Sequence, residues 1–111
     1  MIRPTRFYSK KQERAVAKAL KGRRTANSGA TLWSKGDVVT QKFLLECKTV
    51  TEERQSFTIQ KEWLEKNKEE AFAMNKPYNA LVFDFGDGEQ HYVIDEKLFQ
   101  MLLKHIEEGY L

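Results

Sequence analysis

The sequence predicts a single α/β domain of 111 residues, in which helices flank a small mixed sheet. Two observations predict this class. Apolar residues recur at helical spacing near both ends of the chain, and short apolar or alternating runs lie between them, bounded by Gly, Asn and Pro. The predicted order of elements is α-β-β-α-β-β-α, and the length allows one modest hydrophobic core.

The first helix is expected to begin at Ser9 and end near Lys21. Ser9 and Gln12 have the spacing of a capping box, in which each side chain bonds the backbone amide of the other. Gly22 follows as a residue that commonly ends a helix.

The later elements follow from turn residues and periodicity. Residues 23–35 read as a loop, and strands 37–40 and 43–50 follow, joined at Gln41-Lys42. A second helix over 59–75 stops before Pro77, because a residue that precedes proline disfavours helix. Its residues expected to pack in the core are Trp63, Leu64, Ala71 and Phe72. Strands 79–85 and 89–94 flank the turn Gly86-Asp87-Gly88, and Asp95 caps a last helix over 96–108.

The charge of the chain is unevenly distributed. The net charge is +3, but residues 1–35 contain ten of the 19 Lys and Arg residues and only Glu13 of the 16 acidic residues. A block this basic usually meets a polyanion, so we expect contact with nucleic acid. The alternative is a solvated surface that aids solubility.

Membrane and secreted classes are disfavoured. No apolar run approaches the roughly 18 residues of a membrane span, and the first residues lack the apolar core of a signal peptide. The lone cysteine, Cys47, excludes an intrachain disulfide and cysteine-based zinc motifs. We therefore expect a cytoplasmic protein with no membrane partner.

Glu13 falls on the apolar face of the first predicted helix, with Val16, Ala17 and Leu20. A carboxylate facing inward is costly unless something positive meets it. The alternative is an edge position where Glu13 reaches water or a lysine.

Two further acidic residues are expected to face each other. A two-residue turn at Gln41-Lys42 places Asp37 opposite Glu46, with Cβ atoms roughly 5 Å apart. Two facing carboxylates repel each other, and a bound cation would resolve the repulsion. Oxygen ligands favour Mg²⁺ or Mn²⁺ over zinc.

Lys48 falls on the same strand face as Glu46, whereas Cys47 falls on the opposite face as a small buried apolar residue. Lys48 could orient a water molecule or neutralise charge that develops on a phosphate. A bare Glu-X-Lys is also common as a surface pair, so the interpretation depends on Asp37, Glu13 and the basic segment together.

Gly36-Asp37 followed after eight residues by Glu46-Cys47-Lys48 resembles the PD-(D/E)XK nuclease superfamily. Within it, the short length, Gln12-Glu13-Arg14, Arg23-Arg24 and Ser28-Gly29 resemble the archaeal-type Holliday-junction resolvases, including those of phages. The resemblance implies a restriction-endonuclease-like core, a homodimer and Mg²⁺-dependent cleavage of four-way DNA junctions in a prokaryotic or phage-infected cell, with Mn²⁺ able to substitute.

The resemblance also implies roles for individual residues. Glu13, Asp37 and Glu46 fall on the metal-binding acids, Lys48 on the catalytic lysine and Ser28 on a loop serine near the scissile phosphate. The main-chain carbonyl of Cys47 would complete the metal shell. The residues expected to contact DNA are Arg14, Lys18, Lys21, Arg23, Arg24 and Lys35. Two departures are Gly36, where the family has proline, and a longer stretch from Gly29 to Gly36.

Two alternative functions stay open from the sequence. One is a nuclease with the same core that acts on flaps, nicks or linear duplex. The other is a non-catalytic DNA-binding module in which the acids are ordinary surface residues.

Overall fold

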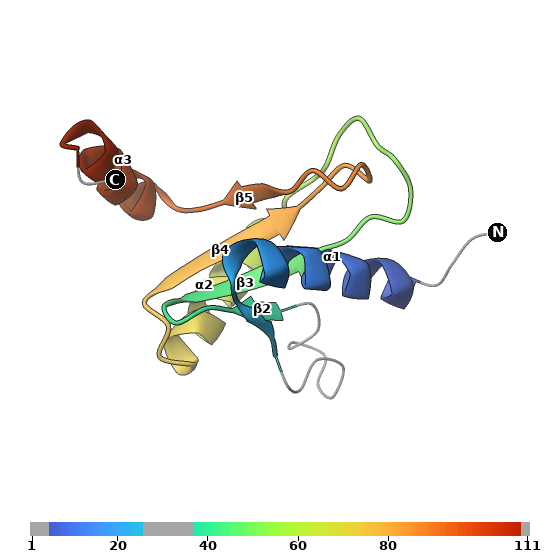
Figure 1. Cartoon of the computed structure of the whole chain (residues 1–111), viewed down its shortest axis with the longest axis horizontal. Coiled ribbons are helices and arrows are strands. Elements are labelled where there is room, and N and C mark those ends of the chain that lie inside the picture. Colours follow the sequence, from blue (N-terminus) through green and yellow to red (C-terminus); the bar gives the residue numbers. More distant parts are fainter. Residues whose placement is uncertain (1–4, 26–36, 110–111) are drawn as a thin grey trace.

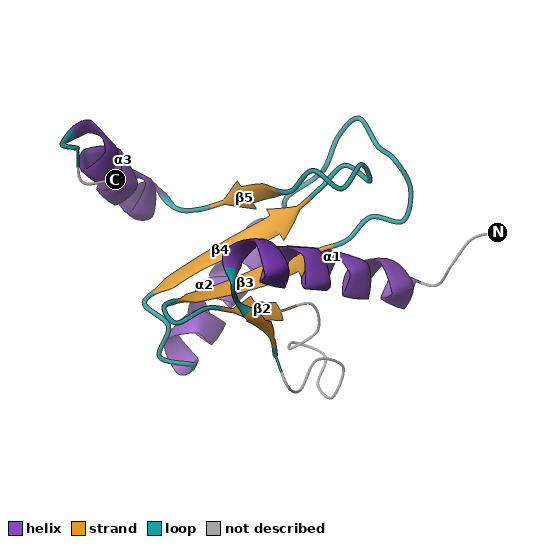
Figure 2. Cartoon of the chain, in the orientation of Figure 1, coloured by secondary structure: helices purple, strands orange, loops and turns teal. Residues whose placement is uncertain are grey.

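The computed structural model describes residues 5–25 and 37–109, and it shows a five-stranded mixed sheet with helices on both faces (Figure 1). The elements are α1 (Thr5–Leu20), β1 (Arg23–Arg24), β2 (Asp37–Val39), β3 (Phe43–Lys48), α2 (Lys61–Ala73), β4 (Tyr78–Phe83), β5 (His91–Val93) and α3 (Glu96–Glu107). The α/β class and the predicted order are confirmed, with β1 as an addition where a loop was expected (Figure 2).

The strands lie in the order β1-β2-β3-β4-β5, and β3 and β4 form the parallel pair. The other neighbouring strands are antiparallel. A parallel pair needs a crossover connection, which here is α2. In Figure 1, α1 lies in front of the sheet and α2 behind it.

Because helices cover both faces, alternate residues of β2 and β3 enter different cores. The core beneath α1 consists of Val16, Val38, Leu45, Cys47, Ala80 and Val82. The core beneath α2 consists of Val39, Leu44 and Ala71. The register of these strands therefore decides which helix each side chain meets.

The hairpin of β2 and β3 has the predicted register. Asp37 pairs with Glu46, and Val38 and Val39 pair with Leu45 and Leu44. At the turn, the Thr40 amide donates to the Phe43 carbonyl and the Phe43 amide donates to Thr40 Oγ1, both at 3.1 Å. This side-chain bond stabilises a turn that lacks the usual Asn-Gly chemistry.

The capping-box prediction for α1 is wrong. The helix begins at Thr5, so Ser9 lies inside it. Gln12 is buried, and its amide nitrogen donates to Gln90 Oε1 at 3.0 Å while its oxygen accepts from Thr49 Oγ1 at 2.8 Å. Gln12 thus ties α1 to two distant loops, because a buried amide must find hydrogen-bond partners.

The core of α2 differs from the prediction. Ala71 is buried as expected, but Phe72 is 84% exposed and Leu64 is also exposed. The second buried residue is Asn67, whose Oδ1 accepts from Asn79 Nδ2 at 2.7 Å. A polar residue therefore takes the central position under α2.

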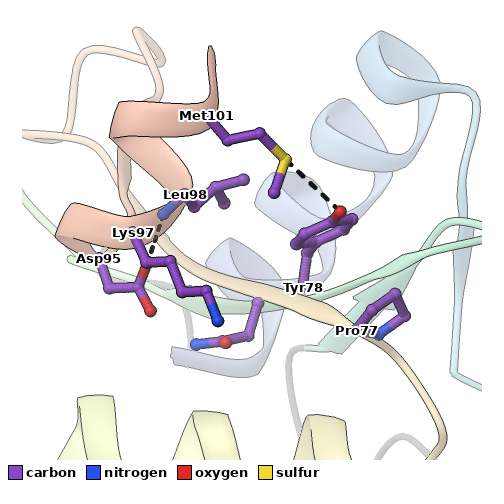
Figure 3. Close-up of a pocket in the computed structure, with 7 residues that line it drawn as sticks. Pro77, Tyr78, Asp95, Lys97, Leu98 and Met101 are labelled. Carbon is purple, nitrogen blue, oxygen red and sulfur yellow. Dashed lines mark hydrogen bonds between the residues drawn. The ribbon is translucent and has the colours of Figure 1, made fainter. Parts of the chain in front are cut away.

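The last helix, α3, projects away from the sheet beyond β5 (Figure 1). The predicted cap is confirmed, since the Leu98 amide donates to Asp95 Oδ1 at 2.8 Å. Leu98 is its one buried residue, and Tyr78 donates from its hydroxyl to Met101 Sδ at 3.6 Å across a hollow (Figure 3). Apolar side chains left exposed on α3 are Phe99, Met101, Leu102, Leu103 and Ile106.

Gly22 provides a test of the packing between α1 and the sheet. A Cβ atom added at Gly22 would lie 2.7 Å from the backbone oxygen of Val39. Backbone cannot move aside cheaply, so we expect Gly22→Ala to destabilise the protein by about 1–3 kcal/mol in urea denaturation. Ala19→Ser adds one heavy atom at an exposed position of α1 and should change stability by about 0.5 kcal/mol or less. Equal stability of the two variants would contradict this packing.

Candidate active site

Asp37 and Glu46 face each other on the side of the sheet that α2 covers. They are register partners, and Val39 and Leu44 on the same strand faces pack beneath α2. Asp37 is 2% exposed and Glu46 is 6% exposed. The structure therefore buries two opposed carboxylates, as the hairpin register predicts.

Glu70 of α2 completes a group of three carboxylates. One oxygen from each of Asp37, Glu46 and Glu70 lies within 4.8 Å of the others. Glu70 was not among the residues predicted from the sequence, because it stands in a stretch of α2 rich in charged residues. The signal that was available is spacing: Trp63, Asn67 and Glu70 are separated by four and three residues and so share one helix face.

The ionised forms of Asp37 and Glu70 are disfavoured by burial and by neighbouring carboxylates. Burial raises the pKa of Asp37 to about 8, with further increases from Glu46, Glu70 and Glu13, while Lys48 acts to lower it. Burial also raises the pKa of Glu70, and Glu46 adds to this effect, against the opposing charges of Lys66 and Lys48. Asp37 Oδ1 and Glu70 Oε1 are buried without a hydrogen-bond partner among the residues that the structure describes. These oxygens are arranged to accept a cation or a proton.

The group fits a hard divalent cation. In an octahedral Mg²⁺ shell with bonds of about 2.1 Å, the ligand oxygens lie about 3–4 Å apart. The carboxylate oxygens here are within 4.8 Å of one another, so small side-chain rotations would close them around one ion. The donor set contains only carboxylates, which suit Mg²⁺ and Mn²⁺ better than zinc.

Lys48 lies at the edge of the acidic group, as the strand alternation predicts. Its Nζ is 3.0 Å from Glu46 Oε2, and its side chain is 27% exposed. The same Nζ lies 4.1 Å from the ring centroid of Trp63 on α2. The ammonium is therefore held between a buried carboxylate and an aromatic face.

Glu13 lies outside the group of three acids that the described residues form. It is 2% exposed, and its Oε1 accepts from Arg24 Nε at 3.0 Å. The expected positive partner of this inward carboxylate is therefore Arg24 of β1. Glu13 still lies close enough to raise the pKa of Asp37.

Cys47 is a buried core residue, as predicted. Its side chain packs beneath α1. Burial raises the pKa of its thiol above the usual value, and nearby carboxylates, of which Glu13 has the largest effect, raise it further. A thiol that is hard to ionise is a poor nucleophile and a poor metal ligand. Only the main chain of Cys47 remains as a donor toward the acidic group.

Most of the predicted DNA-contacting residues are exposed. Arg14 and Lys18 lie on the outer surface of α1, Lys21 lies in the turn that follows it, and Arg23 lies on β1. Arg24 is half-buried, and it bonds to Glu13. Ser28 and Lys35 lie outside the described residues.

A basic hollow lies beside the β2–β3 turn. It is lined by Lys21, Gly22, Arg23, Val39, Thr40, Gln41 and Lys76. Lys76 Nζ donates to the Thr40 carbonyl at 2.8 Å and to the Gln41 carbonyl at 3.2 Å. Three cationic side chains thus line one hollow, and the described residues of its lining include no acid. This arrangement is suited to a phosphate group.

Neither a protein-family model, nor a curated protein, nor a solved structure matches this chain. The site is therefore assigned from its own geometry. Among the described helices, none combines the length and apolar character needed to cross a membrane.

The raised pKa of Asp37 predicts how stability depends on pH without metal. The group keeps its proton up to about pH 8 in the folded protein but loses it near 3.8 when unfolded. The contribution of Asp37 to the free energy of unfolding is therefore fully present below about pH 4. It is lost as pH rises toward 8, and the free energy of unfolding falls by at most about 1.4 kcal/mol per pH unit.

Melting curves in EDTA between pH 4 and 8 test this expectation. At pH 8, Asp37→Asn should be more stable than the parent, and its stability should fall less between pH 4 and 8. Adding Mg²⁺ at pH 8 should raise the stability of the parent, because the ion binds only the folded protein. Glu69→Gln, at an exposed position beside Glu70, serves as the control and should follow the parent curve. A parent curve that rises steadily from pH 4 to 8 would contradict the burial of an ionisable Asp37.

Proposed function

We propose that this chain is a metal-dependent endonuclease that hydrolyses phosphodiester bonds in DNA, as a structure-selective nuclease of the PD-(D/E)XK type. The observation that carries the proposal is the buried Asp37–Glu46 pair, joined by Glu70, with Lys48 at its edge. Buried carboxylates without partners cost stability. A role in holding a cation accounts for that cost, whereas a non-catalytic DNA-binding module does not.

Asp37, Glu46 and Glu70 would hold Mg²⁺, with Mn²⁺ as a substitute and the Cys47 carbonyl as a further donor. When bound, such an ion polarises a phosphate oxygen and lowers the pKa of water. Glu13 remains part of the proposal as a nearby negative charge that fixes Arg24 through their 3.0 Å bond. Glu70 takes the place that the sequence assigned to Glu13 among the direct ligands.

Lys48 would act on the substrate. Its ammonium lies beside the acids and its side chain is partly exposed, so we propose that it meets a phosphate that approaches the cluster from solvent. There it would neutralise developing negative charge or orient the attacking water. Ser28 is retained as a residue that contacts the scissile phosphate, on the family resemblance alone.

The basic surface would bind the DNA backbone. Arg14 and Lys18 of α1 supply exposed positive charge, and Lys21, Arg23 and Lys76 supply it around the hollow. Lys35 is retained from the sequence alone. Contacts to phosphates carry little base information and weaken steeply with salt. Recognition would therefore depend on the shape of the DNA.

A four-way junction is the proposed substrate, and a homodimer the proposed active form. The described part of each chain contains a single group of acids suited to a metal, so paired nicks in two strands need two copies. The exposed apolar face of α3 offers area for such a contact, since patches of this kind mark interaction sites.

The substrate is tested by incubating the protein with Mg²⁺ and a synthetic four-way junction, a flap, a nicked duplex or a linear duplex. We expect paired symmetric nicks in the junction. Preferred cleavage of another substrate would keep the nuclease and change its specificity. Binding without cleavage in Mg²⁺ or Mn²⁺ would leave only the DNA-binding module.

Variants of the acids test the site itself. We expect Asp37→Asn, Glu46→Gln and Glu70→Gln to reduce cleavage by more than about 100-fold while junction binding in EDTA is retained, because the removed charges hold the cation and do not contact DNA. Glu69→Gln is the matched control on α2 and should cut at the parent rate. Parent-level cutting by Asp37→Asn or Glu46→Gln would show that the site lies elsewhere.

A further inference from the structure

Trp63 supports the lysine of the proposed site. The sequence assigns Trp63 to core packing, but in the structure it is half-buried and its ring centroid lies 4.1 Å from Lys48 Nζ. A cation this close to an indole face is attracted by the quadrupole of the ring, whose face has a negative electrostatic potential, and Trp attracts cations more strongly than Tyr or Phe.

The backbone and neighbouring rings fix the position of Trp63. It shares a face of α2 with Asn67 and Glu70, and Asn67 is fully buried and bonded to Asn79 of β4. A tilted contact joins the Trp63 ring to Phe57 at 6.2 Å between centroids. Phe57 in turn stacks on Phe83 at 4.4 Å, and Phe83 is the register partner of Lys48. The indole is therefore held by the same helix and sheet that hold the acids.

Metal binding would change the surroundings of Lys48. In the structure its ammonium is 3.0 Å from Glu46 Oε2. A divalent ion on Glu46 repels the ammonium and competes for the same carboxylate oxygens. An indole ring does not ligate such an ion through its face. We therefore expect the contact between Lys48 and Trp63 to remain when the ion is bound.

We propose that Trp63 is a positioning residue, which keeps the Lys48 ammonium at the mouth of the acidic group once a cation occupies Glu46. The proposal rests on the proposed nuclease function. It gives α2 two roles, because the same helix face supplies a metal ligand through Glu70 and holds the phosphate-facing lysine through Trp63.

The contact can be tested without any cleavage. Trp33→Phe leaves Trp63 as the one tryptophan of the two in the chain. In that background, Lys48→Met should change the indole emission, because it removes the charge over the ring. The emission difference between the two proteins should persist when Mg²⁺ is added to saturation. Loss of the difference on adding Mg²⁺ would show that Lys48 leaves the ring, and would overturn the proposal.

Kinetics test the consequence for catalysis. On junction DNA, Trp63→Leu should lower kcat about tenfold, equivalent to about 1.4 kcal/mol, with KM unchanged. Trp63→Phe should fall between the parent and Trp63→Leu. Phe72→Leu makes a similar change at an exposed position of α2 and should have no effect.

Two outcomes separate a positioning role from a structural one. Calorimetric Mg²⁺ affinity should be the same for Trp63→Leu and the parent, whereas a displaced α2 would move Glu70 and weaken it. Parent-level kcat in Trp63→Leu would overturn the role of Trp63 and leave the nuclease intact. Failure of the parent to cleave any substrate would remove the nuclease, and the role of Trp63 with it.

Discussion

The antiparallel register of β2 and β3 is the constraint on which the rest of the site depends. It sets Asp37 opposite Glu46 on the face that α2 covers, while Val38 and Leu45 pack beneath α1. A slip of one residue would exchange these sets, placing carboxylates in the apolar core and aliphatic side chains at the site. Correct packing of the sheet and correct assembly of the acids are therefore the same event.

Burying these carboxylates lowers the stability of the folded protein when no cation is bound. Asp37 is 2% exposed, and its Oδ1 is buried with no hydrogen-bond partner within residues 5–25 and 37–109. Lys48 offsets part of the negative charge through Glu46, and its effect on Asp37 opposes those of the neighbouring carboxylates. A protein can keep such a group only when the surrounding fold is stable enough, so strain of this kind tends to mark functional positions.

The site could be predicted from the sequence where it depends on local rules. The Asp37–Glu46 pairing follows from strand alternation and the place of the turn, and Asp95 was recognisable as a cap because its side chain precedes an apolar helix. Spacing alone places Glu70 on one helix face with Trp63 and Asn67, but it does not say what that face meets, because this depends on how the crossover helix α2 lies across the sheet. The capping-box prediction for Gln12 was wrong for the same reason, since its hydrogen-bond partners Gln90 and Thr49 are far away in the sequence.

The crossover connection explains why those long-range residues matter. Parallel strands β3 and β4 oblige the chain to cross one face of the sheet, and that face is the one carrying Asp37, Glu46 and Lys48. Any polar residue on the inner side of α2 then has to meet the acids, be satisfied by another polar group, or stay unpaired. Glu70 meets the acids. Asn67 is satisfied only at its Oδ1, which accepts from Asn79, while its Nδ2 has no hydrogen-bond partner among the described residues. The topology that closes the core therefore also selects which helix residues take part in the chemistry.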